Sequence, residues 1–198
     1  MIKFNDLNHE IPYKLLKEKY DEALNAGQEN IEAISISSYN KEISEVDSRY
    51  VNLKFINKEE FIFFSNYYSP KASAFNSHNQ IAALLYWSNI NVQIRMKAKI
   101  KKTTKEFNQK YFYDRSKEKN ALAISSNQSK QIDSYSQVIE NYNRSLEGDD
   151  LKKCPKYWGG YSFTPYYFEF WEGHKSRINK RKAFNKTDGI WRQIFLQP

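Results

Sequence analysis

The stretch from Ile90 to Ile100 constrains the fold most strongly, because apolar and polar residues alternate along it without interruption. This period of two is typical of a β-strand with one face on a core and the other in solvent. Such a strand requires partners in a sheet, and further strand-like segments occur along the chain. They are residues 31–37, 49–56, 61–66, 81–87, 161–171 and 189–195. The polar residues 57–60 predict a turn that joins the second and third of these segments into a hairpin.

Helical patterns precede and separate these strands. Apolar residues recur at helical spacing over residues 15–24, and Gly27 follows as a stop signal. Ser69 and Pro70 predict the start of a short helix, because serine is a good N-cap and proline is tolerated at the first helical position. The chain therefore places one helix before the sheet and another between its strands.

Two more helices are predicted in the second half of the chain. Thr103 and Glu106 have the spacing of a capping box, so a helix should begin there. Residues 128–147 form the longest helical pattern, and its apolar side consists of Ile132, Tyr135, Ile139, Tyr142 and Leu146. Antiparallel strands with helices inserted between them predict an α+β fold, mainly β, in the form of a barrel.

The length of 198 residues predicts one domain, residues 1–198, with residues 1–28 as an N-terminal helical segment. The longest apolar run, residues 81–87, is far shorter than a membrane span, and the N-terminus lacks the apolar core of a signal peptide. We therefore expect a cytoplasmic protein that does not bind a membrane.

Cys154 is the only cysteine, and the three histidines are scattered without the spacing of metal ligands. We therefore expect neither a disulfide nor a metal. The net charge is +8, and the whole basic excess lies in the second half of the chain. Such an excess suits nucleic acid, an anionic membrane surface or small phosphorylated ligands. Because the charges are interleaved with acids and no recognition motif is present, we do not expect nucleic-acid binding.

The C-terminal region combines aromatic residues, turn glycines and spaced arginines. Trp158 precedes two glycines, Trp171 lies at the end of a predicted strand, and Arg177 and Arg181 follow. Tryptophan offers a flat face to a heterocycle, and the fork of donors on arginine matches phosphate or a ring carbonyl. These residues suit a planar anionic ligand. The alternative interpretation is an aromatic strand pair that ends in a basic surface loop, because such a structure has the same residue types.

Phosphate-binding candidates occur where strands meet helices. Ser65, Ser69 and Lys71 lie where a strand runs into a helix N-terminus, which presents free amide donors. Gln128 and Ser129 lie at the predicted start of the long helix and repeat this arrangement. In both places serine is also an ordinary cap.

Five further residues are candidates from their spacing or their place on a strand. Arg49 and Lys54 are five residues apart on one predicted strand, so an ideal pleat directs them to opposite faces. Tyr111 and Arg115 are one helical turn apart and can present a hydroxyl and a guanidinium to one ligand. Gln93 projects from the polar face of the clearest strand, where it is either a ligand to a ring edge or an ordinary surface residue.

The order and spacing of these pieces resemble the pyridoxamine 5′-phosphate oxidase family, flavoenzymes with an FMN-binding split β-barrel. The resemblance covers nearly the whole chain from about Ile31. The segments that carry it are Arg49–Lys54, Phe61–Asn66 with Ser69, Pro70 and Lys71, Leu84–Trp87 with Gln93, Tyr111–Arg115, Gln128 with Ser129, Trp158–Tyr161, and Glu169–Trp171 with Arg177 and Arg181.

The resemblance implies an FMN-dependent oxidase that forms pyridoxal 5′-phosphate from pyridoxamine or pyridoxine 5′-phosphate and reduces oxygen to hydrogen peroxide. It also implies a homodimer with FMN at the subunit interface. The implied FMN ligands are Arg49, Phe64, Ser65, Ser69, Lys71, Gln93, Gln128, Ser129, Trp171 and Arg181. The implied substrate ligands are Lys54, Tyr111, Arg115, Lys119, Arg177 and Asn179, and Arg177, over the substrate ring, is the implied catalytic residue.

The chain departs from the family pattern at four positions. Pro70 replaces an arginine at the FMN phosphate, and Lys119 replaces a serine at the substrate phosphate. Asn179 replaces a histidine, and Lys180 replaces an aspartate. These departures leave two alternatives: a related split-barrel oxidase for another anionic heterocycle of the phenazine type, or a flavin- or pyridoxal-phosphate-binding protein without turnover.

Overall fold

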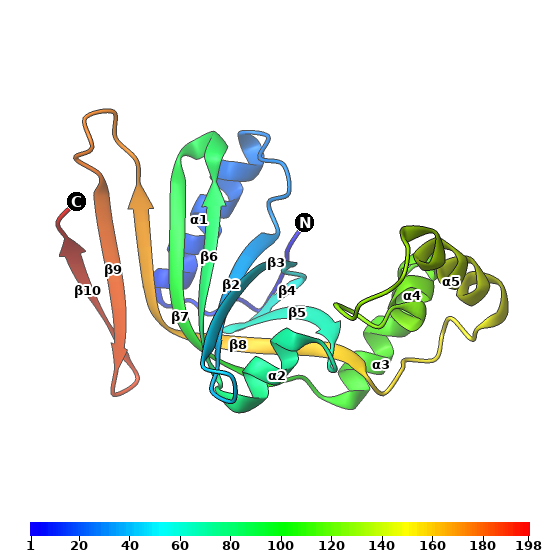
Figure 1. Cartoon of the computed structure of the whole chain (residues 1–198). Coiled ribbons are helices and arrows are strands. Elements are labelled where there is room, and N and C mark those ends of the chain that lie inside the picture. Colours follow the sequence, from blue (N-terminus) through cyan, green and yellow to red (C-terminus); the bar gives the residue numbers. More distant parts are fainter.

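A computed structural model describes all residues, Met1–Pro198, as one curled ten-stranded sheet with helices on one face and at one end (Figure 1). The strands are β1 (Lys3–Asn5), β2 (Ala33–Asn40), β3 (Glu45–Asn52), β4 (Phe55–Asn57), β5 (Glu60–Asn66), β6 (Gln80–Trp87), β7 (Val92–Lys102), β8 (Trp158–Glu172), β9 (Lys180–Thr187) and β10 (Ile190–Leu196). The helices are α1 (Ile11–Asn25), α2 (Pro70–Ser77), the 3-10 turn η1 (Ser88–Ile90), α3 (Lys105–Asp114), α4 (Lys117–Ser125) and α5 (Tyr135–Gly148). The predicted α+β, mainly β fold is therefore confirmed.

The long strand β8 organises the sheet. Along one edge it pairs with β7 over almost its full length. Its other edge is divided, because the first half pairs with β5 and the second half pairs with β9. The sheet continues from β7 through β6 and β2 to β3, and from β5 through β4 to β1. Two groups of strands, one with β7, β6, β2 and β3 and one with β5, β4 and β1, thus share β8 and separate beyond it (Figure 1).

A β-bulge marks the point where the partners of β8 change. Lys97 pairs with Tyr167 and the next residue, Ala98, pairs with Pro165, so Tyr166 is the extra residue. A bulge bends a strand and increases its local twist, and it tolerates proline because an amide is left out of the ladder there. The bend lets one strand take part in both groups.

The barrel closes at the end of β3. The amide of Leu53 donates to the carbonyl of Glu32 (2.9 Å), and the next amide, that of Lys54, donates to Ile62 (2.8 Å). The chain therefore changes partner at this point, from the side of β2 to the side of β5. The predicted continuous strand 49–56 is wrong for this reason, although the predicted turn is confirmed, since Asn57 pairs with Glu60.

The core consists mainly of aromatic and β-branched side chains from both strand groups. Phe61 stacks on Phe163 with ring centroids 5.1 Å apart, and both are fully buried. Helix α1 covers the sheet and contributes Tyr13, whose ring meets Phe168 edge-on at 5.3 Å. The strand predicted from alternation is confirmed as β7, where Ile94, Met96 and Ala98 are buried while Lys97 and Lys99 are exposed.

The longest predicted helix begins later than expected. Helix α5 starts at Tyr135 because the hydroxyl of Ser134 accepts from the amide of Gln137 and caps it. Gln128 and Ser129 lie in the preceding loop, where Ser129 has a φ of 67°, so they are not at a helix N-terminus. The predicted apolar side is also largely unburied, since Tyr135 is 78% exposed.

Helix α3 starts one residue later than the predicted capping box. Thr104 is the N-cap and accepts from the amide of Phe107, whereas Thr103 bonds to Asn108. Four elements have no counterpart in the sequence-based expectation: the short strand β1, the 3-10 turn η1, the separate helix α4, and β9. No helix combines the length and apolar character needed to cross a membrane.

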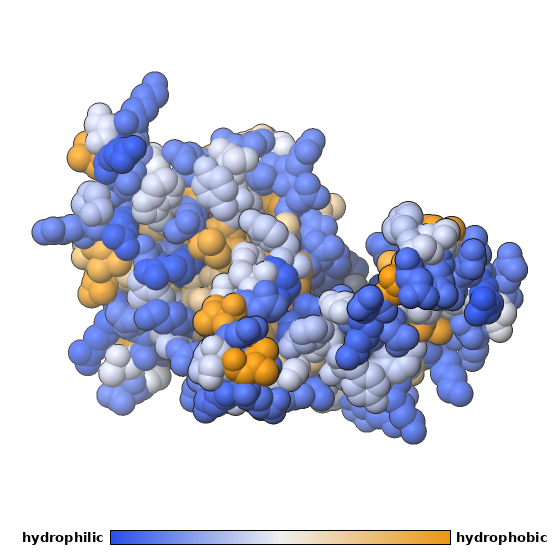
Figure 2. All heavy atoms as spheres, viewed as in Figure 1, coloured by the Kyte–Doolittle hydropathy of each residue, from blue (hydrophilic) through white to orange (hydrophobic).

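The surface carries apolar residues in a few places. Figure 2 shows them at the side of the molecule where β9 and β10 lie, and near the end of the hairpin formed by β2 and β3. Ile190 and Phe195 of β10 are 64% and 69% exposed, and Val46 of β3 is 73% exposed. Both strands are terminal strands of the branched sheet.

We expect Leu16→Ala in α1 to lower the free energy of unfolding by about 2–4 kcal/mol, because Leu16 is 1% exposed and its removal leaves a cavity between helix and sheet. Urea denaturation measures the change. The control Lys14→Ala, on the exposed face of the same helix, should change stability by less than about 0.5 kcal/mol. Equal effects of the two substitutions would contradict the packing of α1 described above.

Candidate functional site

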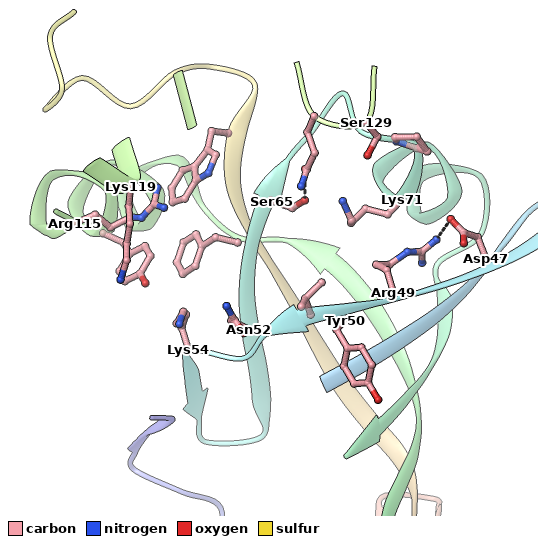
Figure 3. A pocket seen from close by; sticks show the side chains of 16 residues that line it. Asp47, Arg49, Tyr50, Asn52, Lys54, Ser65, Lys71, Arg115, Lys119 and Ser129 are labelled. Atoms are coloured by element: carbon pink, nitrogen blue, oxygen red, sulfur yellow. Dashed lines mark hydrogen bonds and ion pairs between the residues drawn. The ribbon is translucent and has the colours of Figure 1, made fainter. Parts of the chain in front are cut away.

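One large cavity, of about 750 Å³, lies between the end of β3, strand β5, helix α2 and the lobe of α3 and α4 (Figure 3). It brings together ten of the residues proposed from the sequence, drawn from six segments of the chain. These are Arg49, Lys54, Phe64, Ser65, Lys71, Tyr111, Arg115, Lys119, Gln128 and Ser129. The other lining residues are Asp47, Tyr50, Val51, Asn52, Pro70 and Trp158.

A first group of cations lies at the α2 end of the cavity. The side chain of Arg49 is only 16% exposed, and its Nη1 donates to the Ser38 hydroxyl (2.8 Å). Lys71, in the first turn of α2, is 8% exposed and its ammonium lies 3.4 Å from the Ser69 hydroxyl. Burial and then the charge of Arg49 hold the pKa of Lys71 below its usual value. The opposite charge of an anion placed here would counteract both effects on this pKa.

A second group of cations lies at the α3–α4 end, where Figure 3 shows Lys54, Arg115 and Lys119 facing the same space. Burial, with the charges of Lys119 and Arg115, lowers the pKa of Lys54, although Glu32 lies 3.9 Å away and opposes the shift. Burial also lowers the pKa of Arg115, and its Nη1 is buried without a hydrogen-bond partner. A buried donor of this kind is costly unless a ligand satisfies it.

Arg49 and Lys54 line the same cavity, contrary to the expectation of opposite faces. The expectation assumed one regular strand, whereas β3 ends at Asn52 and the chain crosses to β5 at Leu53 and Lys54. Because the chain changes direction there, the alternation of side chains between the two faces of β3 does not continue to Lys54. The two residues therefore serve the two cation groups of one cavity.

An aromatic wall separates the two cation groups. The rings of Phe64 and Tyr111 are 3.9 Å apart and 15° from parallel, and Trp158 stacks on the Phe64 ring at 5.1 Å. The guanidinium of Arg115 lies 4.6 Å from the ring centroid of Trp158. This cation–π contact fixes the arginine beside the wall. The arrangement is suited to a flat ligand with anionic groups.

The loop before α5 reaches the cavity through Gln128. Its side-chain oxygen accepts from the Ser65 hydroxyl (3.1 Å) and from the Asn66 amide (3.3 Å). Ser65 and Gln128 are thus held together across the cavity edge, and Ser129 lies next to them. The predicted helix N-terminus is absent here, so side chains replace helix amides as the polar groups of this loop.

Ser69 lies beneath the cavity and does not line it. It occupies the N-cap position of α2, but its hydroxyl donates to the carbonyl of Asn66 (2.7 Å) and does not cap the helix. At 1% exposure it is a support for Lys71, whose ammonium it contacts.

A buried network holds α3 against β8. The Asn108 side-chain oxygen accepts from the amide of Gly160 (2.8 Å) and from Thr103 (2.6 Å), and its nitrogen donates to Tyr67 (3.0 Å). Gly159 must be glycine here, because a Cβ would lie 2.2 Å from the Tyr67 oxygen. Since α3 carries Tyr111 and ends at its C-cap residue Arg115, this network helps to set their position in the cavity.

Five proposed residues lie elsewhere. Gln93, Trp171 and Arg181 are direct neighbours across β7, β8 and β9. Arg181 forms an ion pair with the buried Glu169 (2.7 Å), which also pairs with Arg95.

Arg177 and Asn179 belong to the connection between β8 and β9, where Arg177 has a φ of 61° and Asn179 accepts from the amide of His174 (3.0 Å). Trp158 and Trp171 lie near opposite ends of β8, up to about 40 Å apart on an extended strand. One chain therefore does not bring the five residues to the cavity (Figure 1).

Sequence reasoning missed several lining residues, above all Asp47, Tyr50 and Asn52. Asp47 is two residues from Arg49, so strand parity places both on one face and could have identified it. Nothing in the sequence pattern indicated Asn52, because its exposure to the cavity depends on where β3 ends. Trp158 was recognised as an aromatic surface, and the structure adds its place on the cavity wall.

Two solved structures share this fold. PhzG from Burkholderia lata 383, in complex with tetrahydrophenazine-1-carboxylic acid, has a TM-score of 0.88 at 23% identity and covers 94% of this chain and 92% of that one. A pyridoxamine 5′-phosphate oxidase-related, FMN binding protein from Nostoc punctiforme has a TM-score of 0.78 at 11% identity and covers 96% of this chain and 99% of that one. The fold is therefore that of the split-barrel FMN-binding proteins, as the resemblance implied.

Curated relatives define the family. The pyridoxine/pyridoxamine 5′-phosphate oxidase 1 of Hydrogenovibrio crunogenus is 31% identical over 191 residues, which are 94% of this chain and 88% of that protein. The Coxiella burnetii pyridoxine/pyridoxamine 5′-phosphate oxidase is 31% identical over 189 residues, 94% and 95% of the two chains. Residues 158–198 match the pyridoxine 5′-phosphate oxidase C-terminal dimerisation region. The chain belongs to the pyridoxine/pyridoxamine 5′-phosphate oxidase family.

We expect Asn108→Ala to lower the free energy of unfolding by about 1–3 kcal/mol, because it leaves the buried amide of Gly160 and the hydroxyl of Thr103 without their acceptor. Hydrogen exchange should show faster opening of α3. Asn143→Ala, on the exposed surface of α5, is the control and should change neither quantity. Unaltered exchange in α3 of the Asn108 variant would show that the network does not hold this helix.

Proposed function

We propose that this protein is an FMN-dependent oxidase that converts pyridoxamine or pyridoxine 5′-phosphate to pyridoxal 5′-phosphate, with oxygen reduced to hydrogen peroxide. The observation that carries the proposal is the single cavity with two cation groups and an aromatic wall between them. FMN and the substrate each carry one phosphate on a flat ring system, so the reaction requires two anion sites. Membership of the family supports the same activity.

The α2 end of the cavity fits the FMN phosphate. Arg49 and Lys71 supply charge, and Ser65, Gln128 and Ser129 supply polar groups around it. Pro70 lines the same end in place of the family's arginine and contributes no donor. Only two cations, Arg49 and Lys71, are therefore present at the phosphate position. FMN bound here would supply the redox chemistry, hydride acceptance and reoxidation by oxygen, while these residues would supply binding, orientation and charge.

The α3–α4 end fits the substrate phosphate. The orphaned Nη1 of Arg115, the Tyr111 hydroxyl and the ammonium groups of Lys54 and Lys119 surround it. Lys119 takes the place of a family serine and adds a charge, which favours a doubly ionised phosphate. The stacked rings of Trp158 and Phe64 limit how deeply the substrate ring can enter.

A second copy of the chain would complete the site. Gln93, Trp171, Arg177, Asn179 and Arg181 are proposed ligands that lie too far along β8 to reach the cavity of their own chain. They belong to, or adjoin, the region that matches the family's dimerisation region. The exposed apolar residues of β10 lie in the same region (Figure 2). In the proposed homodimer these residues meet the flavin ring and the substrate held by the partner, and Arg177 lies over the substrate ring.

The first test is reduction of the flavin without oxygen. The protein, reconstituted with FMN, should lose its visible flavin absorbance when pyridoxamine 5′-phosphate is added, and should regain it and release pyridoxal 5′-phosphate in air. Absorbance spectroscopy measures both steps. If FMN binds but saturating substrate never bleaches it, the protein is a binding protein without this turnover.

The second test uses the substrate phosphate. We expect Arg115→Gln to lower kcat/KM for pyridoxamine 5′-phosphate by at least about 30-fold, because it removes charge-assisted hydrogen bonds to phosphate. Activity on unphosphorylated pyridoxamine should change much less. Lys110→Gln, on the exposed side of α3, is the matched control. An equal loss with both substrates would mean that Arg115 does not bind the phosphate.

A second candidate function is oxidation of another anionic heterocycle. It is favoured by Asn179, which cannot exchange a proton near neutral pH as a histidine can, and whose side chain already accepts from the His174 amide. The likeness to the PhzG structure, which holds tetrahydrophenazine-1-carboxylic acid, suggests that compound as a probe. Its turnover, together with no activity on either phosphorylated vitamer, would select this function.

A further inference from the structure

Both terminal nitrogens of the Arg49 guanidinium already contact groups of the protein. Its Nη1 donates to the Ser38 hydroxyl (2.8 Å) and to the carbonyl of Ile36 (3.2 Å), while its Nη2 forms an ion pair with Asp47. Figure 3 shows Asp47 at the cavity edge with its carboxylate against the guanidinium. An anionic ligand that uses Arg49 therefore meets a carboxylate that is already in contact with it.

Asp47 and Arg49 are two residues apart on β3 and so share a face of this edge strand. Their environments differ, because the Asp47 side chain is 67% exposed and the Arg49 side chain is 16% exposed. The hydrogen bond from Arg49, with a contribution from the charge of Lys71, holds the pKa of Asp47 below its usual value. The α2 end thus contains a carboxylate beside its two cations.

The ion pair differs from the other contacts of Arg49. Ser38 is 3% exposed and Ile36 is fully buried, so these contacts fix the guanidinium from inside the protein. Asp47 approaches from the solvent side, and exposed ion pairs contribute little net stability. The carboxylate can therefore leave Arg49 at small cost, whereas its negative charge opposes a phosphate next to Arg49 and Lys71.

We propose that Asp47 is an internal competitor for the phosphate of the cofactor and sets the affinity for FMN. The inference rests on the proposed function, because it assigns FMN to the α2 end of the cavity. Asp47 pairs with Arg49 in the free protein, and the phosphate displaces it or shares the guanidinium with it. Pro70 makes this competition more effective, since only Arg49 and Lys71 supply charge at this end.

The test is flavin binding by the apoprotein, measured by fluorescence titration with FMN and with riboflavin, which has the same ring and side chain but no phosphate. Asp47→Asn should lower the Kd of FMN by about three- to tenfold and leave the Kd of riboflavin unchanged. Asp188→Asn is the matched control for net charge, because Asp188 lies in the turn between β9 and β10 with a φ of 51°, which asparagine accepts. It should change neither Kd.

A second arm tests whether Asp47 acts through Arg49. In an Arg49→Gln background, Asp47→Asn should change the Kd of FMN far less than in the wild type, because its partner is absent. If Asp47→Asn binds FMN equally or more weakly, or gains affinity for riboflavin in parallel, this inference is overturned. FMN binding by the wild type would in that case still leave the proposed function standing. If neither wild type nor variant binds FMN, both fail.

Discussion

The structure depends on the double use of strand β8. One edge of this strand pairs with β7 throughout, while the other edge pairs first with β5 and then with β9. The bulge at Tyr166 provides the bend between the two regions. Several cavity residues are positioned through this strand, because β5, which carries Phe64 and Ser65, pairs with its first half, and α3 is tied to its start through Asn108.

The cavity concentrates positive charge that the protein only partly neutralises. Burial lowers the pKa of Lys71 and of Lys54, and Arg115 keeps a buried donor without a partner. A protein bears such costs at a site where a ligand compensates them. The carboxylates nearby differ in position: Glu32 lies behind Lys54, whereas Asp47 lies at the solvent edge and competes for the same cation as the ligand.

The separation of the proposed site residues into two sets connects binding to assembly. The cavity set surrounds the first residue of β8, Trp158, and the second set surrounds Trp171 near its other end. Beside the second set, the buried carboxylate of Glu169 forms ion pairs with both Arg95 and Arg181. In the proposed homodimer, a site built from two chains would use residues near both ends of this one long strand.

The sequence by itself determined the mainly β fold, the strand β7 and the inventory of cations and aromatic residues, because alternation and composition are local properties. The resemblance added the family. Only the tertiary structure decided that Arg49 and Lys54 share a cavity, since the chain changes hydrogen-bond partners at Leu53. It also decided that Gln128 hydrogen-bonds to Ser65 from a loop instead of a helix end, and that Asp47 faces Arg49. These outcomes depend on pairing between distant segments, which periodicity along one segment does not encode.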